Sequence, residues 1–93
     1  MRSRFSAFAE RDAAYLLKTW HPATRPDDVE VENGPRWLRL EIVREEAGGP
    51  DDDRGVVEFR AHYLDGTTPG ELHEISRFTR HDGEWVYVRG KTS

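Results

Sequence analysis

The hexapeptide HEISRF, residues 73–78, carries four side chains that could take part in acid–base or ionic chemistry. They are the imidazole of His73, the carboxylate of Glu74, the hydroxyl of Ser76 and the guanidinium of Arg77. The surrounding residue types are typical of a β-strand, and successive side chains of a strand point to opposite faces of a sheet. The chemistry therefore depends on which elements position these four groups.

The composition indicates a small acidic domain. The chain has 93 residues, of which 35% are hydrophobic and 34% are charged, and its formal net charge is -4. A chain this short builds a single hydrophobic core, so we predict that residues 1–93 form one domain. The negative charge gives no general attraction to phosphate backbones and disfavours nucleic acid as the main partner. Most of the cations are arginine, which suits local pairing with carboxylates and phosphates.

The chain contains no cysteine, which excludes disulfides and thiolate metal sites and fits a reducing cytoplasm. No apolar run has the length of a signal peptide or approaches the roughly 18 residues of a membrane span, so we expect a cytoplasmic protein without a membrane partner. We expect no cofactor and no metal site either, because no ligand spacing recurs among the four histidines. These are His21, His62, His73 and His81.

The N-terminal residues predict a helix pair. Apolar residues recur at steps of three and four between Phe5 and Trp20, which is helical periodicity. Asp12 can cap a second helix, so we predict a break near Arg11 and an end before the proline that follows His21. An imidazolium at the C-terminal end of a helix is favoured by the helix dipole, and we interpret His21 as such an end-cap.

The rest of the chain predicts a sheet of about four antiparallel strands. Alternating apolar and polar residues, or strand-forming residues beside a tight turn, occupy residues 36–45, 56–64, 71–81 and 84–90. In the first of these strands, Leu38, Leu40 and Ile42 are expected to share the buried side. The connector between the helices and the sheet contains DVEVE, residues 28–32, which predicts a further short strand.

The Asp-Gly dipeptide at residues 82–83 predicts a two-residue hairpin turn and so sets the register of the last two strands. The predicted pairs are His81 with Glu84, Arg80 with Trp85, Phe78 with Tyr87 and Ser76 with Arg89. One face then carries Leu72, Glu74, Ser76, Phe78, Trp85 and Tyr87, and the other carries His73, Ile75, Arg77, Thr79, Val86 and Val88. The four polar groups of the hexapeptide therefore do not form one cluster.

The aromatic face is expected to lie under the helices, because burying Phe78, Trp85 and Tyr87 outweighs burying two valines and an isoleucine. Glu74 then points inward, where a carboxylate needs water, a proton or a partner such as Arg89. Two interpretations of Glu74 follow: a structural ion pair, or a general base or ligand anchor. The opposite face has mixed charge and is either solvated or a polar-rimmed dimer interface.

The predicted fold class is α+β, with the N-terminal helix pair packed on a curved antiparallel sheet. A small sheet that curls against two helices leaves a cone-shaped cavity at its open end. Concave apolar places of this kind are where small molecules bind.

Four segments, in this order and spacing, resemble the YchJ-like family of bacterial proteins over nearly the whole chain. They are MRSRFSAFAERDAAYLLKTWHPATRP, GVVEFRAHY, LHEISRF and DGEWVYVRG. The resemblance implies the nuclear-transport-factor-2-like fold, often accompanied by a Cys-rich SEC-C zinc motif that this chain lacks. It also implies that Met1 falls inside the family's first helix, as in a shortened relative or a fragment. The family commonly has Arg where Ile75 stands, and it supplies no established reaction, since relatives of this fold include enzymes and binding modules.

Three hypotheses for the function follow. The first is a non-catalytic module that binds a small molecule or a protein, with a cavity formed by Trp20, Tyr63, Glu74, Ser76, Phe78, Trp85, Tyr87 and Arg89. The second is a small isomerase or dehydratase with Glu74 as the base and a Tyr or Ser hydroxyl that polarises a carbonyl. The third is an interaction module that forms a homodimer or joins a larger assembly. No catalytic residue is assigned beyond Glu74 in the second hypothesis.

Overall fold

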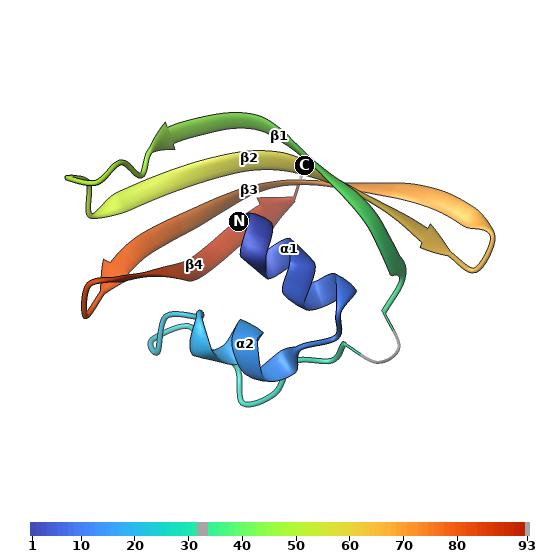
Figure 1. Cartoon of the computed structure of the whole chain (residues 1–93), viewed down its shortest axis with the longest axis horizontal. Helices are drawn as coiled ribbons and strands as arrows, with labels where there is room; N and C mark the ends of the chain where they lie inside the picture. Colours follow the sequence, from blue (N-terminus) through green and yellow to red (C-terminus); the bar gives the residue numbers. More distant parts are fainter. Residues whose placement is uncertain (32–33, 93) are drawn as a thin grey trace.

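Two short helices lie on one side of a four-stranded antiparallel sheet in the computed structural model, which describes residues 1–31 and 34–92 (Figure 1). The elements are α1 (Arg2–Ala9), α2 (Ala13–Lys18), β1 (Arg36–Ala47), β2 (Arg54–Asp65), β3 (Thr68–His81) and β4 (Glu84–Thr92). The strand order is β1-β2-β3-β4, so each strand pairs with its neighbour in the sequence. The predicted α+β class is confirmed.

The helix pair forms as predicted, with a break between α1 and α2. Arg11 adopts a positive φ of 58°, and the side chain of Asp12 caps α2 by accepting a hydrogen bond from the backbone N–H of Tyr15 at 3.1 Å. Within the described residues, Ala7, Leu16 and Val31 form a buried cluster that holds the two helices and the following connector together. No helix of this part of the chain is long and apolar enough to cross a membrane.

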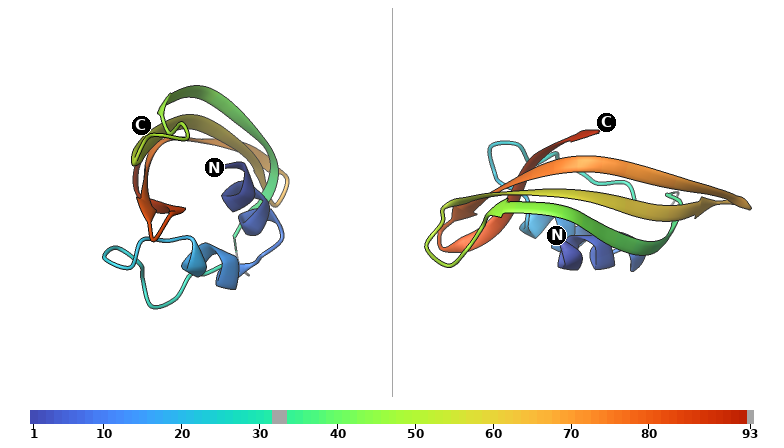
Figure 2. Two further views of the ribbon diagram at one scale, coloured as in Figure 1. Left: turned by 60° about the vertical axis from the view of Figure 1, so that its left-hand side comes forward. Right: turned by 90° about the horizontal axis from the view of Figure 1, so that it is seen from above.

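The strands arch over α1, as the end-on and top views show (Figure 2). The chain after α2 meets the free edge of β4, where Trp20 forms a parallel bridge with Tyr87. Two backbone hydrogen bonds of 2.7 Å make this bridge, one from the N–H of His21 to the carbonyl of Tyr87 and one from the N–H of Tyr87 to the carbonyl of Thr19. The helix pair is thereby attached to one edge of the sheet.

Two bulges interrupt β1, and one of them makes a predicted burial wrong. Trp37 pairs with Tyr63 and Arg39 with His62, which leaves Leu38 as an extra residue, and Val43 is extra in the same way. Leu38 is 50% exposed and Val43 is 41% exposed, so Leu38 does not share the buried side with Leu40 and Ile42. Strict alternation fails here because each bulge inverts the facing of the residues after it.

The β3–β4 hairpin has the predicted turn, but its register changes further along. Asp82 and Gly83 both have positive φ, at 53° and 82°, and the pairs from His81–Glu84 to Phe78–Tyr87 are as predicted. A bulge at Val88 then shifts β4 by one residue. Ser76 therefore pairs with Gly90, and the predicted pairing of Ser76 with Arg89 is wrong.

The predicted short strand at residues 28–32 is also wrong for residues 28–31, which are irregular; residue 32 lies outside the described residues. Val31 is 7% exposed because it packs on Ala7 and Leu16 of the helix pair instead of entering the sheet. The alternating apolar residues of this segment therefore reflect packing against the helices and not pairing in the sheet.

Candidate ligand-binding site

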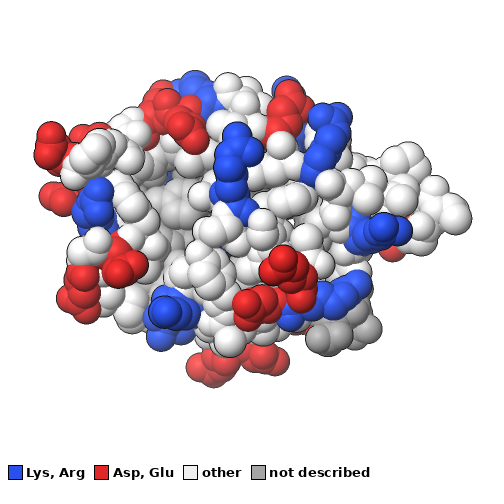
Figure 3. Space-filling model, viewed as in Figure 1, with Lys and Arg blue, Asp and Glu red and all other residues white. Residues whose placement is uncertain are grey.

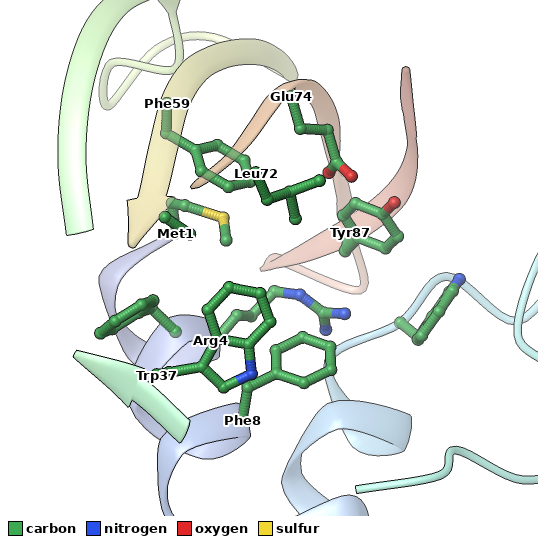
Figure 4. Close-up of a pocket in the computed structure, with 11 residues that line it drawn as sticks. Met1, Arg4, Phe8, Trp37, Phe59, Leu72, Glu74 and Tyr87 are labelled. Carbon is green, nitrogen blue, oxygen red and sulfur yellow. The ribbon is translucent and has the colours of Figure 1, made fainter. Parts of the chain in front are cut away.

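An apolar cavity of about 200 Å³ lies between α1 and the face of the sheet that α1 covers (Figure 4). Its apolar lining consists of Met1, Phe5, Phe8, Trp20, Trp37, Phe59, Ala61 and Leu72. Three side chains with polar groups complete the lining, namely Arg4 from α1, Glu74 from β3 and Tyr87 from β4. A cavity with a few polar groups among aromatic rings is the usual form of a small-molecule site.

Arg4 is the buried cation of this site, with an exposed fraction of 4%. One terminal nitrogen, Nη1, donates hydrogen bonds to the carbonyl of Leu16 at 3.1 Å and to Oγ1 of Thr19 at 2.8 Å. The guanidinium carbon lies 4.4 Å from the ring centroid of Tyr87 and 5.1 Å from that of Trp20. Burial lowers the pKa of Arg4, and nearby tyrosine and glutamate side chains partly oppose this shift, yet arginine stays protonated in proteins. The cavity therefore has a permanent positive wall.

Glu74 supplies the acceptor of the site. Its carboxylate accepts a hydrogen bond from Oγ of Ser76 at 2.5 Å, and Ser76 is fully buried. Among the described residues no ion pair reaches Glu74, so the structural ion pair that we considered is absent there. A side chain in place of Gly90 would collide with the carboxylate of Glu74 on β3 and with the hydroxyl of Tyr87 on the same strand as Gly90.

Tyr87 lies between the two charged groups, with the Glu74 carboxylate beside it and the Arg4 guanidinium on its other side (Figure 4). Burial raises the pKa of Tyr87, the negative charge of Glu74 raises it further, and the positive charge of Arg4 acts against both. The phenol is therefore neutral at physiological pH and can act as a hydrogen-bond donor.

The structure distributes the predicted site residues over four places. Trp20, Glu74 and Tyr87 line the cavity, and Ser76 contacts it through Glu74. Phe78 and Trp85 line an adjoining hollow of about 230 Å³, Tyr63 packs on Trp37 with ring centroids 5.3 Å apart, and Arg89 lines a separate groove. Arg89 is absent from the cavity because the bulge at Val88 turns it to the opposite face.

Sequence reasoning missed Arg4, which is the most deeply buried charged side chain of the site. Its signal was its position: Arg4 precedes Ala7 and Phe8 by three and four residues and so lies on the apolar stripe of α1. A long cation on a buried stripe indicates a partner in the core, here the carbonyl at the end of α2 and two aromatic rings.

The uncovered face of the sheet is ionic. The imidazole Nε2 of His73 lies 2.6 Å from a carboxylate oxygen of Glu58, and Arg44 contacts the other oxygen at 3.3 Å. The hydrogen bond from His73, and then that from Arg44, lower the pKa of Glu58 despite some desolvation. Around the molecule as seen in Figure 3, side chains of both signs are interspersed with uncharged surface. Val86, one of the apolar residues predicted on this face, is 6% exposed and has little surface to offer to a dimer partner.

A four-stranded antiparallel sheet with two helices over an apolar cavity places the chain among the α+β domains, and the matching family has the nuclear-transport-factor-2-like fold. The chain belongs to the YchJ family, because the family described as "YchJ, middle NTF2-like domain" matches residues 1–90. The predicted family is confirmed.

Curated relatives support the assignment. The chain is 50% identical over 91 residues to a UPF0225 protein of Streptomyces coelicolor, a match that covers 98% of this chain and 70% of that protein. It is 47% identical over 93 residues to a UPF0225 protein of Chromobacterium violaceum, with 97% and 69% covered. A third relative, a UPF0225 protein of Streptomyces avermitilis, is 50% identical over 91 residues and has 62% of its length covered.

Two solved structures share the fold over the whole of this chain. A SEC-C motif containing protein from Rhodopseudomonas palustris has a TM-score of 0.85 at 28% identity, with 75% of its chain covered. A SEC-C motif containing protein from Psychrobacter arcticus has a TM-score of 0.75 at 25% identity, and the present chain spans 58% of its length.

Proposed function

We propose that the domain is a binding module for a small, largely apolar molecule, held at the closed end of a cone-shaped cavity between α1 and the sheet. One observation carries the proposal: an apolar cavity contains a buried arginine and a glutamate that do not form an ion pair with each other. A buried cation without a paired carboxylate is costly to a fold unless other contacts stabilise it. A guest with a hydrogen-bond acceptor would add such a contact.

The contacts define the chemistry of the guest. Both hydrogen bonds of Arg4 described above come from Nη1, so the N–H groups of its other nitrogens can donate to a guest. The buried indole N–H of Trp20 also has no partner among the described residues. A guest that accepts from Arg4 and donates to Glu74 would satisfy the polar groups of the cavity. The volume of about 200 Å³ is below the range of drug-sized pockets, which favours a small, flat metabolite.

A cavity-filling substitution tests the proposal. Ala61 is 3% exposed and lines the cavity, so Ala61→Leu should occupy part of the guest's volume. A metabolite library is screened against the chain by thermal shift, and hits are measured by calorimetry. We expect a hit whose affinity falls by about tenfold or more in Ala61→Leu, the equivalent of about 1.4 kcal/mol.

Ala14→Leu, a change of the same size at an exposed position of α2, serves as the control and should bind as the wild type does. A hit whose affinity is unchanged by Ala61→Leu would place the guest elsewhere. A complete absence of hits, with a crystal structure in which the cavity has collapsed, would refute the proposal.

A second candidate function is a small isomerase or dehydratase. It is favoured by the carboxylate of Glu74, which is free of an ion pair among the described residues and lies beside a neutral Tyr87 phenol. In this alternative Glu74 takes a proton from the guest and Tyr87 polarises a carbonyl. If a guest found by the screen is turned over, Glu74→Gln should abolish turnover while it retains most of the binding. Equal loss of both would assign Glu74 to binding alone.

The predicted homodimer and the cytoplasmic location remain part of this proposal. Light scattering across a range of protein concentrations measures the first, and fractionation of the host cell measures the second. The relatives extend beyond the region that this chain matches, so any partner of their further segments is a separate question.

A further inference from the structure

A groove of about 440 Å³ lies on the other side of the sheet, where the segment after α2 passes β4. Its charged lining is formed by Arg54 of β2, Arg77 of β3 and Arg89 of β4, all of which are exposed. Val56 and Val88 add apolar surface to the groove. The groove is separate from the cavity under α1, because the two have no lining residue in common.

The arginines of this groove face each other. Arg77 and Arg89 are directly opposite partners in the β3–β4 ladder. Arg54 is diagonal to Arg77, since Arg54 pairs with Thr79 and Arg77 with Val56. Lys91 continues the row, opposite Ile75. Like charges that are directly opposite across strands destabilise a sheet, so this arrangement works against the stability of the fold.

No carboxylate offsets this charge within residues 1–31 and 34–92, where none of these four cations has an ion pair. The other end of the same face differs: Arg44 pairs with Glu58, and Arg60 lies within 4.0 Å of Glu41 and Glu71. Glu58 lies diagonal to Arg77 across the β2–β3 ladder, and it is engaged by His73 and Arg44. Acids are available on this face, and they lie beside other cations.

The bulge at Val88 creates the pair. Without the extra residue Val88 would face Arg77, and Arg89 would face Ser76 on the helix-covered side, near Glu74. The bulge therefore exchanges a favourable charge contact for a repulsive one. An anion between the two guanidinium groups would remove the repulsion.

We propose that this groove binds the phosphate group of a small organic phosphomonoester. Three guanidinium groups present planar forks of donors that match phosphate oxygens, and their charge suits a doubly charged anion. Val56 and Val88 offer an apolar surface to the organic part, and the volume lies in the range of small-molecule sites. The net charge of -4 opposes long polyanions, so the positive charge is local.

Phenyl phosphate is the probe, titrated into the chain at constant ionic strength and followed by calorimetry and by NMR chemical shifts. We expect saturable binding with the largest shifts at residues 54, 77 and 89. Arg77→Gln and Arg89→Gln should each weaken binding by about tenfold or more, because each removes charge-assisted hydrogen bonds. Arg39→Gln, an exposed arginine of β1 outside the groove, is the matched control and should bind as the wild type does.

A second measurement separates lost binding from lost folding. Without the probe, Arg77→Gln should melt at the same temperature as the wild type or higher, since it removes a like-charge pair. Sodium chloride that causes the same shifts at equal ionic strength, or wild-type affinity in both glutamine variants, would overturn the proposal. Inorganic phosphate that binds as tightly as phenyl phosphate would overturn the assignment to an organic ester. Ala61→Leu should leave phenyl phosphate binding unchanged, which keeps this test independent of the cavity.

Discussion

At the scale of single residues, the cavity stabilises a cation with rings and carbonyls. The guanidinium carbon of Arg4 lies 5.1 Å from the ring centroid of Trp20 and 4.4 Å from that of Tyr87. Arg4 also donates hydrogen bonds to a main-chain carbonyl and a hydroxyl. Desolvated cation–π contacts contribute about 2 kcal/mol, which offsets part of the cost of burial. The carboxylate of Glu74 is then left for another partner.

The pKa of the Tyr87 phenol should depend on the charge of Glu74. Because burial and Glu74 raise the pKa of Tyr87 above its ordinary value of 10.0, the folded protein holds this proton more tightly than the unfolded chain does. The resulting stability is complete below pH 10 and is lost as the pH rises through the raised pKa. Glu74→Gln should lower the pKa of Tyr87, measured by ultraviolet absorbance of the phenolate during an alkaline titration.

Glu84→Gln, at an exposed glutamate beside the hairpin turn, is the control for this titration. In Tyr87→Phe, the loss of stability above pH 10 should become shallower when unfolding by urea is measured at each pH. An unchanged phenolate titration in Glu74→Gln would show that burial alone raises the pKa of Tyr87.

At the scale of elements, the bulges determine which side chains face the cavity. Two bulges in β1 expose Leu38 and Val43, and the one in β4 turns Arg89 outward. Bulges also increase the local twist of a sheet, which helps strands to wrap around what covers them. The helix-covered face is therefore apolar although β1 and β4 do not alternate strictly.

Tyr63 of β2 pairs with Gly70 of β3 near the turn that joins these two strands, and this contact can be tested by substitution. A Cβ at Gly70 would lie inside contact distance of the Tyr63 ring, so Gly70→Ala must displace that ring and disturb its contact with Trp37. We expect a loss of about 1–3 kcal/mol in the free energy of unfolding, measured with urea.

Gly34→Ala is the matched control for Gly70→Ala, since the nearest atom to its Cβ is 3.8 Å away. If the tyrosine is the cause, Gly70→Ala should cost much less in a Tyr63→Leu background. Equal costs in the two backgrounds would assign the effect to the backbone of β3.

Local signals made the helix pair, the hairpin turn and the α+β class predictable, because each depends on caps, periodicity or a turn dipeptide. Alternation alone did not locate the bulges, because at the adjacent apolar pairs Trp37-Leu38 and Ile42-Val43 it does not tell which member is the extra residue. The error at Arg89 and the error at Leu38 each come from a bulge. Arg4 was missed for a different reason: its partners come from α2 and β4, which are distant in sequence.

At the scale of the whole molecule, the helix pair closes the cavity while it is fixed to one edge of the sheet. The backbone bonds between Thr19, His21 and Tyr87, and the hydrogen bond from Thr24 Oγ1 to the carbonyl of Val88 at 2.7 Å, join the two layers at β4. The central strands β2 and β3, by contrast, have a paired strand on each side. Fewer contacts must therefore break for the helix pair to open than for the sheet to open.

Amide hydrogen exchange should reveal this difference. The amides of β2 and β3 should exchange slowest and those of α1 and α2 faster, because local opening follows the least stabilised unit. A guest in the cavity should slow exchange in the helices and leave the central strands nearly unchanged. Helix amides as slow as those of β2 would show that the molecule opens only as a whole.

The bulge at Val88 has a consequence for natural variation within the YchJ family. Deletion of one residue at this point of β4 would move an arginine from the outer groove to the carboxylate under the helices, with no other mutation. In relatives that lack this one residue, the positive charge of the arginine would lie in the cavity under the helices instead of in the outer groove. An alignment column at position 89 would then compare side chains that lie on opposite faces of the sheet.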